Sequence, residues 1–400
     1  MKSTVILPDQ SDISEFFRLK KYFSSSGNQV VFLTFLFFLG VVVPQMDVPA
    51  QSLDIPSKHY GLSIGNSREF TGVRFNFRDN RVKEINGINF TLWTARKQNN
   101  DAVVNGISWG VIPEAGYLKG IQLGIIAVGA KYQIKGFSAG LVGAGSGGDF
   151  SGIGIGGLGV GAGGSLKGIF IGGLGAGAGG DVKGIVFGGF GAGAGGNMTG
   201  ISIGGLGAGA GSDVKGIVFG GLGAGAGGNM TGISIGVLGA GAGEDLKGIV
   251  IGGLGAGTGA NASGILIGGL GAGTGDNMTG IAFGGLGAGC GNELKGVAIG
   301  GLGVGAPIVK GLLFGGFGTG GRNVRGVLLA GCWNKVESEG SLSGLSASAF
   351  NLIKGNQTGL SLGIVNYAWH LNGFQIGLVN YVKDNPKYLK VLPLINAHFD

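Results

Sequence analysis

Apolar and variable positions alternate in a repeated unit that dominates the middle of the chain. Residues Gly152–Lys295 form nine consecutive units of sixteen residues, and each unit begins with Gly. Counting that Gly as position 1, positions 2 and 4 are almost always Ile, Val, Leu or Phe, whereas position 3 varies, as in Phe170, Val186 and Ser202. This period of two predicts a β-strand, and we expect positions 2 and 4 to form its buried face. An α-helix is excluded, because its apolar positions recur every 3.6 residues and abundant glycine destabilises it.

The apolar positions change phase after the Gly-Gly pair at positions 5 and 6. They then fall on positions 7, 9 and 11, as in Leu206, Ala208 and Ala210, and position 15 is apolar too. A straight strand keeps its buried face on one parity, so the change indicates a corner, where glycine adopts dihedral angles closed to other residues. Positions 12–16 read Gly-Gly-Asp/Asn-apolar-Lys/Thr, a turn composition that predicts a second corner.

Two short strands and two corners in each unit describe one coil of a narrow solenoid. The fold class that we predict is all-β, a repetitive β-solenoid of coils of about 16 residues. Coils stack about 4.8 Å apart, so the 21 units counted from Gly61 predict a rod on the order of 100 Å long. Ile and Phe of one sheet would meet Leu and Ala of the other in a small interior.

An antiparallel outer-membrane β-barrel with one unit per strand is the alternative fold. A unit is long enough for a spanning strand of 9–11 residues and a turn, and position 16 alternates imperfectly between Lys and Thr or Ser, as in Lys183 and Thr199. Against a barrel, neither face of the units is polar enough to line a lumen, and all the turns are alike. The alternation could instead come from duplicated pairs of coils, which would set Asp/Lys rows beside Asn/Thr rows.

The repeats divide the chain into four parts. Residues 1–50 are predicted to be a signal peptide, 51–151 degenerate N-terminal repeats or a cap, 152–325 the regular glycine-rich repeats, and 326–400 degenerate C-terminal repeats or a cap. The signal is indicated by the fourteen-residue apolar stretch 30–43, which is too short for a spanning helix, and by Val48-Pro-Ala50 as a cleavage site. An uncleaved membrane anchor is the competing interpretation of this segment.

Composition narrows the class of protein. Glycine accounts for 96 of 400 residues and proline for only 8, so the chain is neither collagen-like nor a Pro/Gly-rich disordered tract. The net charge of +7 is spread along the chain without a dense basic run, so we expect no nucleic-acid partner. The two cysteines, Cys290 and Cys332, replace a repeat Ala and a repeat Leu, and are expected to be buried thiols.

Candidate chemistry is sparse. The glycine strings match loose dinucleotide patterns only because the repeat generates them, without the helix that such a site needs. His59, His370 and His398 lack metal-ligand spacing, and the Gly-x-Ser-x-Gly matches at Ser63 and Ser361 fall in the repeat register. The sequence therefore predicts a non-enzyme with no catalytic, cofactor-binding or metal-binding residues, no cofactor and no evident small-molecule substrate.

The larger side chains gather outside the regular array. If the chain binds a partner through single residues, exposed aromatic and Arg side chains near the ends are the candidates; an alternative is that they close the ends of the solenoid. They are Arg74, Arg78, Trp93, Arg96, Trp109, Trp333, Tyr367, Trp369, Tyr381 and Tyr388.

The C-terminal units carry a resemblance to a known group. The runs Gly359-Leu-Ser-Leu-Gly-Ile-Val-Asn-Tyr and Gly373-Phe-Gln-Ile-Gly-Leu-Val-Asn-Tyr resemble bacterial glycine-rich surface-repeat proteins built on a Gly-x-Gln-x-Gly-Leu-x-Asn unit. The closing Asn385-Pro and Leu392–Phe399 segments, and the opening Asn86–Trp93 segment, look similar to that group too. The central units depart from it, with Gly in place of Gln and Asn. The resemblance implies export and a surface location in bacteria with an outer membrane, and no known reaction.

These observations predict an exported, non-enzymatic structural or interaction protein at the bacterial cell surface, in the outer membrane or in the periplasm. Its partner would be the outer membrane or another surface component. Two other functions stay open: an outer-membrane β-barrel with a channel or sealing role, and an ice- or surface-binding solenoid. The flat Gly, Ala and Thr faces suggest the latter, although a regular Thr-x-Thr array is missing.

Overall fold

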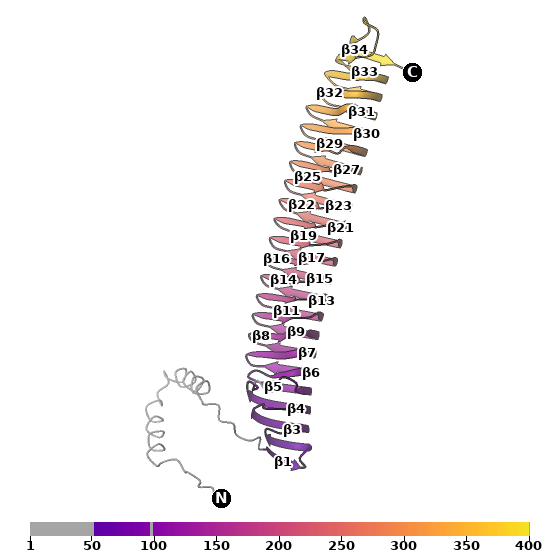
Figure 1. Ribbon diagram of the computed structural model, residues 1–400. Helices are drawn as coiled ribbons and strands as arrows, with labels where there is room; N and C mark the ends of the chain where they lie inside the picture. Colours follow the sequence, from indigo (N-terminus) through magenta and orange to yellow (C-terminus); the bar gives the residue numbers. More distant parts are fainter. Residues whose placement is uncertain (1–51, 97–98, 400) are drawn as a thin grey trace, which may run out of the picture. The chain divides into compact units, whose positions relative to one another are not determined.

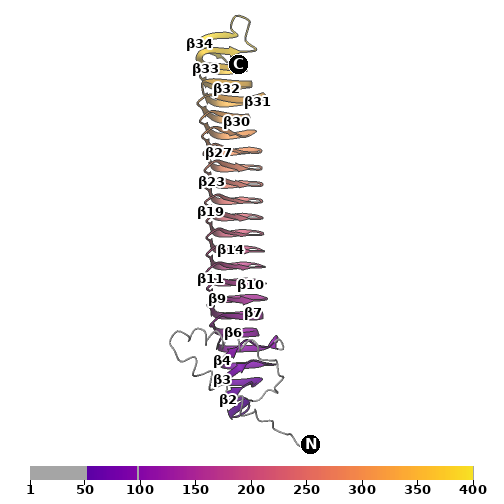
Figure 2. The same ribbon diagram turned by 90° about the vertical axis from the view of Figure 1, so that its left-hand side faces the viewer.

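Stacked parallel strands form one long solenoid in the computed structural model of the chain (Figure 1, Figure 2). The structure describes residues 52–96 and 99–399, so the predicted signal at 1–50 lies outside the described residues. Within these two ranges the chain folds into 34 strands of one sheet system, without an α-helix. Successive units pair in parallel, which confirms the all-β solenoid. The barrel alternative is wrong, because neighbouring strands of such a barrel run antiparallel.

One regular coil consists of a long and a short strand. β13 (Val182–Gly188) and β14 (Gly191–Ala194) make such a coil, and β15 (Met198–Gly204) and β16 (Gly207–Ala210) make the next. β13 pairs with β15 in parallel, and β14 pairs with β16, each with a register offset of one unit, so that Gly184 lies beside Gly200. Two parallel sheets therefore run along the solenoid, one of long strands and one of short strands.

The remaining strands repeat this plan with small changes in length. The other long strands of the regular coils are β9 (Asp149–Gly156), β11 (Leu166–Gly172), β17 (Val214–Gly220), β19 (Met230–Gly236), β21 (Leu246–Gly252), β23 (Ala262–Gly268), β25 (Met278–Gly284), β27 (Glu293–Gly300) and β29 (Ile308–Gly315). The other short strands are β8 (Gly143–Ser146), β10 (Gly159–Ala162), β12 (Gly175–Ala178), β18 (Gly223–Ala226), β20 (Gly239–Ala242), β22 (Gly255–Thr258), β24 (Gly271–Thr274), β26 (Gly287–Cys290) and β28 (Gly303–Gly305). The strands of the two ends are β1 (Ser52–Pro56), β2 (Tyr60–Gly65), β3 (Glu69–Arg78), β4 (Glu84–Trp93), β5 (Val103–Gly110), β6 (Glu114–Gly124), β7 (Ala127–Gly140), β30 (Gly318–Ala330), β31 (Trp333–Ala347), β32 (Phe350–Leu362), β33 (Val365–Val382) and β34 (Val391–His398).

The Gly-Gly pair lies at a corner, as predicted, but the buried positions are odd on both sides of it, so the expected switch from even to odd is wrong. β13 ends at Gly188 and β14 begins at Gly191, so the chain turns at Gly189 and Phe190. A Cβ atom on Gly188 would lie 1.9 Å from the carbonyl oxygen of Gly191. A Cβ on Gly189 would lie equally close, 1.9 Å, to that of Gly173 in the preceding coil. Glycine therefore suits both positions of this coil, although position 6 is Val237 in the coil of β19.

The Gly that opens each unit has a second role within the long strand. All 21 unit-opening glycines from Gly61 to Gly373 have a positive φ, such as 127° at Gly184, and stack in register from coil to coil. A Cβ on Gly184 would lie 2.0 Å from the carbonyl oxygen of Gly168. This column therefore requires glycine for its backbone conformation and for the close approach of adjacent coils.

The expected assignment of inward and outward residues in the long strand is wrong. In β13 the buried side chains are Val182 and Val186, at positions 15 and 3, whereas Ile185 and Phe187, at positions 2 and 4, are about 40% exposed (41% and 43%). Inward and outward residues alternate along the whole strand, from position 15 of one unit through the opening Gly of the next. The odd positions therefore face inward. The nearly constant positions 2 and 4 therefore lie on the outer surface of the long strand, and the variable position 3 lies in the core.

Position 3 varies in size because a large core residue is accompanied by a small one at a neighbouring core position. Phe150, at position 15, and Phe170, at position 3 of the next coil, meet edge to face with ring centroids 4.9 Å apart. Gly154 lies at position 3 of the same strand as Phe150, β9, and its Cβ would lie 2.9 Å from both rings. Elsewhere Met198 accompanies Ser202, and Ala262 accompanies Leu266, all of them buried. A narrow, close-packed interior requires such pairing of large with small residues.

Antiparallel strands close both ends of the stack. β1 pairs antiparallel with β2, and β34 pairs antiparallel with β33, so neither end presents a long unpaired parallel strand. In the last coils the inward column that Ala fills in the regular coils is occupied by Asn334, Asn351, Asn366 and Asn380. Their amides form a buried ladder; Asn351 Nδ2, for example, donates to Asn366 Oδ1 at 2.7 Å. The Asn ladder is thus a feature of the C-terminal coils.

Candidate interaction surface

Two columns of apolar side chains cover the outside of the long-strand sheet. We call the outward residues at positions 2 and 4 the apolar face. The ten of its members that lie in five of the regular coils are 39–44% exposed: Ile153, Ile155, Ile169, Ile171, Ile185, Phe187, Ile217, Phe219, Ile281 and Phe283. The face continues to both ends, for example through Trp109 and Phe374. Because coils pair in register, each column is a continuous apolar row along the solenoid.

A hollow interrupts the apolar face where one of its large residues is missing. Ala139 takes position 4 between Leu123 and Ile155, and the space beside it has a volume of about 360 Å³. Trp109 and Leu141 complete its mainly apolar lining. The hollow belongs to the apolar face and shares its chemistry.

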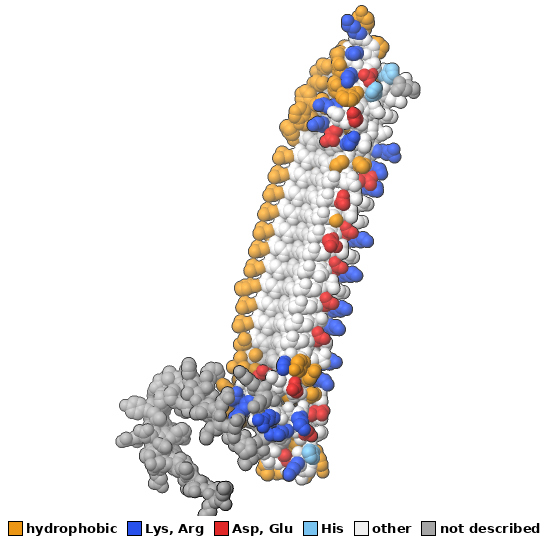
Figure 3. Space-filling model, viewed as in Figure 1, with side chains coloured by type: hydrophobic (Ala, Val, Ile, Leu, Met, Phe, Trp, Pro, Cys, Tyr) orange, Lys and Arg blue, Asp and Glu red, His pale blue; other side chains and the backbone are white. Residues whose placement is uncertain are grey.

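A ridge of large apolar residues follows the Gly-Gly corner. Position 7 points outward there, and its exposure ranges from 43% at Leu174 to 58% at Phe190 and Leu302. We call these residues the leucine ridge: Leu158, Leu174, Phe190, Leu206, Leu222, Leu238, Leu254, Leu270, Leu286, Leu302 and Phe317. A line of hydrophobic side chains along one margin of the solenoid is plain in Figure 3. The ridge extends the apolar surface beyond the sheet to the corner.

Cations border the other side of the apolar face. Position 16 precedes the opening Gly and points outward in the same long strand. The basic residues there, which we call the lysine column, are Lys119, Lys135, Lys167, Lys183, Lys215, Lys247, Lys295, Lys310 and Arg325. No unit from Gly61 onward carries Asp or Glu at this position. Lys295 and Lys310 bind Glu293 at 2.9 and 2.5 Å, whereas Lys183 and Lys215 form no ion pair with a residue that the structure describes.

Acidic residues lie in the turn at position 14, immediately before the buried position 15. There the position-14 side chains form a hydrogen-bonded ladder along the solenoid, in which Asp and Asn largely alternate. Asp181 Oδ1 accepts from the backbone N–H of Asn197 at 2.8 Å, and Asn197 Oδ1 accepts from that of Asp213 at 3.2 Å. Glu293 ends the ladder at Asn277. The rows of Asp and Asn proposed from the 32-residue alternation therefore exist, and they separate like charges.

The outside of the short-strand sheet is flat. Positions 9 and 11 point inward, so positions 8 and 10, both Gly, form the surface. This is the pale area between the two margins in Figure 3. A Cβ on Gly223, at position 8, would lie 3.9 Å from the nearest heavy atom, an ordinary contact. Thr258 and Thr274 of this sheet are buried, so they contribute no outward threonine array.

The residues singled out for chemistry are dispersed. Ser63 and Ser361 are buried in the core column at position 3. His59 is exposed near the first coil, whereas His370 Nδ1 lies 2.6 Å from Asp384 Oδ2 near the last. Across residues 52–96 and 99–399, no group of three or more His, Cys, Asp and Glu side chains is placed to hold a metal ion. Cys290 and Cys332 are half-buried rather than buried, and burial raises the pKa of the Cys290 thiol.

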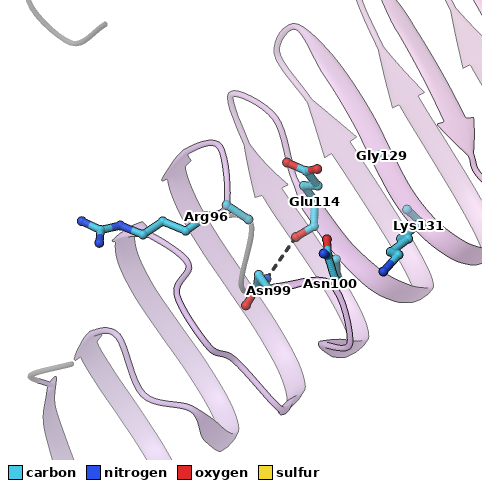
Figure 4. Close-up of a pocket in the computed structure, with 9 residues that line it drawn as sticks. Arg96, Asn99, Asn100, Glu114, Gly129 and Lys131 are labelled. Carbon is cyan, nitrogen blue, oxygen red and sulfur yellow. Dashed lines mark hydrogen bonds between the residues drawn. The ribbon is translucent and has the colours of Figure 1, made fainter. Parts of the chain in front are cut away.

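A pocket of about 250 Å³ is lined by residues that follow β4 and by residues of β6 and β7 (Figure 4). Asn99 Nδ2 donates to the backbone carbonyl of Glu114 at 3.4 Å, and the Arg96 side chain points away from it. Burial raises the pKa of Glu114, and the charge of Arg78 acts in the opposite direction. Among the residues that the structure describes, the pocket brings the Glu114 carboxyl group together with the amides of Asn99 and Asn100 and with Lys131, and it holds no second carboxylate.

The large residues of the ends divide between core and surface. Arg74 is fully buried, whereas Trp109 and Trp333 are 41% and 46% exposed. Trp333 packs edge to face against Phe317 and Phe350, and the rings of Tyr367 and Tyr381 stack 5.1 Å apart. The rings of Trp109 and Trp333 are therefore at the surface, whereas the Arg74 side chain lies in the core.

Comparisons with known proteins give no family to draw on. No family model, no curated protein and no solved structure matches the chain. Within residues 52–96 and 99–399 there is no helix that is long and apolar enough to cross a membrane. The functional argument therefore rests on the surfaces described above.

Proposed function

We propose that this chain is an exported, non-enzymatic structural or interaction protein of the bacterial cell surface, outer membrane or periplasm. It acts as a long, straight scaffold that presents the apolar face to a partner. The observation that carries this proposal is the outward direction of Ile and Phe at positions 2 and 4 in coil after coil.

Surface area supports a binding role. Two residue columns about 7 Å apart, together with the leucine ridge, cover on the order of 1,000 Å² along a rod of this length. Soluble monomers rarely expose contiguous apolar patches larger than a few hundred Å², and a stable interface buries about 800 Å² on each partner. Such a surface is costly to leave in water, which favours a partner that covers it.

Export is supported by the sequence of the N-terminal segment. Its basic residues, its apolar stretch 30–43 and its small residues at Val48 and Ala50 form the pattern of a secretory signal. The resemblance of the C-terminal units to bacterial surface-repeat proteins points the same way.

Fractionation of a bacterium with an outer membrane tests the proposal. The full chain is expected outside the cytoplasm and in the envelope fraction. The variant Phe187→Thr/Phe219→Thr/Phe283→Thr should release it into the soluble fraction, because Thr keeps the strand propensity but removes apolar surface. The matched variant Gly191→Ser/Gly223→Ser/Gly271→Ser changes the opposite sheet, where a Cβ has 3.8–3.9 Å of room, and should leave the distribution unchanged. Retention of the wild type in the cytoplasm, or identical distribution of both variants, would contradict the proposal.

A further inference from the structure

We propose that the apolar face, the leucine ridge and the lysine column together bind the surface of an anionic lipid bilayer, with the solenoid lying along it. This inference rests on the proposed function, since it names the partner of the same face. The apolar face and the leucine ridge adjoin in every regular coil, and the lysine column joins them in the coils whose position 16 is Lys rather than Thr or Ser. In the coil of β13 the outward residues are, in order, Lys183, Ile185, Phe187 and, past the corner, Phe190.

The backbone behind this face is suited to contact with lipid. Hydrocarbon offers no hydrogen-bonding partner, so only fully paired backbone can lie against it. Each long strand of the regular coils pairs with a parallel neighbour on both sides, as β13 does with β11 and β15. The ends are covered by β1 and β34. The apolar side chains of the face therefore cover strands whose backbone groups are hydrogen-bonded to the neighbouring coils.

The positive charge of the lysine column favours a bilayer of anionic lipids. The lysine column directly precedes the apolar face, and acids are missing from position 16 in every unit. Lys side chains lay their aliphatic stems on apolar surface and extend the ammonium group to polar surroundings. An apolar surface edged by Lys is the arrangement with which peripheral elements bind anionic lipid headgroups.

The same charge distribution disfavours a second copy as the occupant. Face-to-face pairing of the regular coils would bring Ile, Phe and Leu together with the Lys, Thr and Ser of position 16, and no carboxylate. The carboxylates that could neutralise Lys183 or Lys215 lie in the position-14 turn, where Asp181 and Asp213 already accept hydrogen bonds from the next coil. A lipid phosphate supplies the missing anion, whereas a second apolar face does not.

Vesicle sedimentation with the purified full chain tests the inference. Vesicles of phosphatidylglycerol and phosphatidylethanolamine should bind the chain at least about tenfold more tightly than phosphatidylcholine vesicles, and added salt should weaken that binding. All variants keep residues 1–51 unchanged, so any contribution from the stretch 30–43 is common to them. Circular dichroism of each variant establishes that the β-structure is retained.

Two pairs of variants locate the binding surface. Ile185→Thr/Phe187→Thr/Ile217→Thr/Phe219→Thr should reduce binding at least about tenfold, because it removes apolar area. Its control, Gly175→Ser/Gly191→Ser/Gly207→Ser/Gly223→Ser, adds small groups where a Cβ has 3.6–3.9 Å of room and should bind as the wild type does. Lys183→Gln/Lys215→Gln/Lys247→Gln should also lose about tenfold and reduce the salt dependence. Its control, Lys335→Gln/Lys387→Gln/Lys390→Gln, removes as much charge elsewhere and should bind normally.

The outcomes distinguish a lipid bilayer from a second copy of the chain as the partner of the apolar face. Binding that the face and lysine variants weaken and the controls preserve supports the bilayer. Absence of vesicle binding, or equal binding by all variants, overturns it. Self-association in solution that only the face variant abolishes, without vesicle binding, also overturns it and identifies a second copy. In these negative cases the proposed function still stands if the Phe→Thr variant is released from the cell envelope, so the two failures are distinguishable.

Discussion

The Asp213 carboxylate accepts two hydrogen bonds from Asn229, the residue one coil further along. Asp213 Oδ1 lies 2.8 Å from the backbone nitrogen of Asn229 and 3.1 Å from its side-chain Nδ2. Asn229 Oδ1 in turn accepts from the backbone N–H of Asp245 at 3.2 Å. An amide thus stands between two carboxylates that would otherwise lie one coil spacing apart, about 4.8 Å.

The first prediction concerns this separation of charge. Asn229→Asp would place three carboxylates in consecutive coils and remove the amide donor, so we expect a lower melting temperature than for the wild type. The loss should be larger at low than at high salt, because ions screen the repulsion. Asn229→Ser is the control, since Ser165 occupies the same ladder position naturally and adds no charge. Equal melting temperatures of Asn229→Asp and Asn229→Ser at low salt would show that repulsion is unimportant.

The ladder also predicts a dependence of stability on acid. Hydrogen bonds from the Asn261 side chain and backbone lower the pKa of Asp245 below its ordinary value. A carboxyl whose pKa is depressed by folding stabilises the native state above its unfolded pKa, and that contribution is lost as the pH falls through the folded value. We therefore expect the melting temperature to fall as the pH drops below about 4.

The variant Asp245→Asn isolates this contribution. Asn at this position can keep the ladder, as Asn261 and Asn277 do, but it does not titrate in this range. Its melting temperature should change less than that of the wild type between neutral pH and pH about 3. Parallel curves for the two proteins would rule out Asp245 as a source of the acid sensitivity.

Two glycines of one coil should respond differently to the same substitution. Gly216→Ala introduces a Cβ 2.0 Å from the Gly200 carbonyl oxygen at a φ of 135°, and we expect a loss of at least about 1–3 kcal/mol. Gly223→Ala meets its nearest atom at 3.9 Å and should be neutral or stabilising by up to about 1 kcal/mol. Hydrogen exchange of the neighbouring coils measures both effects locally, which suits a repeat array whose unfolding need not be two-state. Equal protection in both variants would show that the glycine column is dispensable.

A buried ion pair is expected to hold the first coils. Arg74 Nη1 lies 2.6 Å from Asp79 Oδ1 and 2.8 Å from Asn89 Oδ1. Asp79→Ala leaves the guanidinium buried without its anion, which should cost about 3–5 kcal/mol. Faster limited proteolysis within residues 60–110 would report this loss. The exposed pair Lys83–Glu69, with side chains 72% and 51% exposed, provides the control, and Glu69→Gln should leave proteolysis unchanged.

The glycine pairs of the repeat predict the coil path but not which side of it is buried. They correctly indicate a corner, because a Cβ on Gly188 or Gly189 would lie 1.9 Å from a carbonyl oxygen. The expected change of parity is wrong, since the buried positions are odd in both the long and the short strand. The inward direction of position 3 is not predictable from one unit. Phe170 is tolerated there because Gly154 lies beneath it, and this compensation joins residues sixteen apart. The burial of Arg74 depends likewise on Asp79 and on Asn89 of the next coil. The outward direction of the apolar face is also not predictable from one unit, because repeated Ile and Phe residues are the types that usually fill a core.

Volume exchange in the core gives the last prediction. Gly154→Ala places a methyl group 2.9 Å from the rings of Phe150 and Phe170, and such overpacking should cost about 1–3 kcal/mol. Phe170→Leu alone removes ring atoms from a buried site and should cost about 1 kcal/mol or more. Together, the smaller Leu makes room for the methyl group, so the double variant should be more stable than the sum of the two losses by about 0.5–3 kcal/mol. Hydrogen exchange of β9 and β11 measures this coupling, and strict additivity of the two losses would contradict the role of Gly154 as the partner of Phe170.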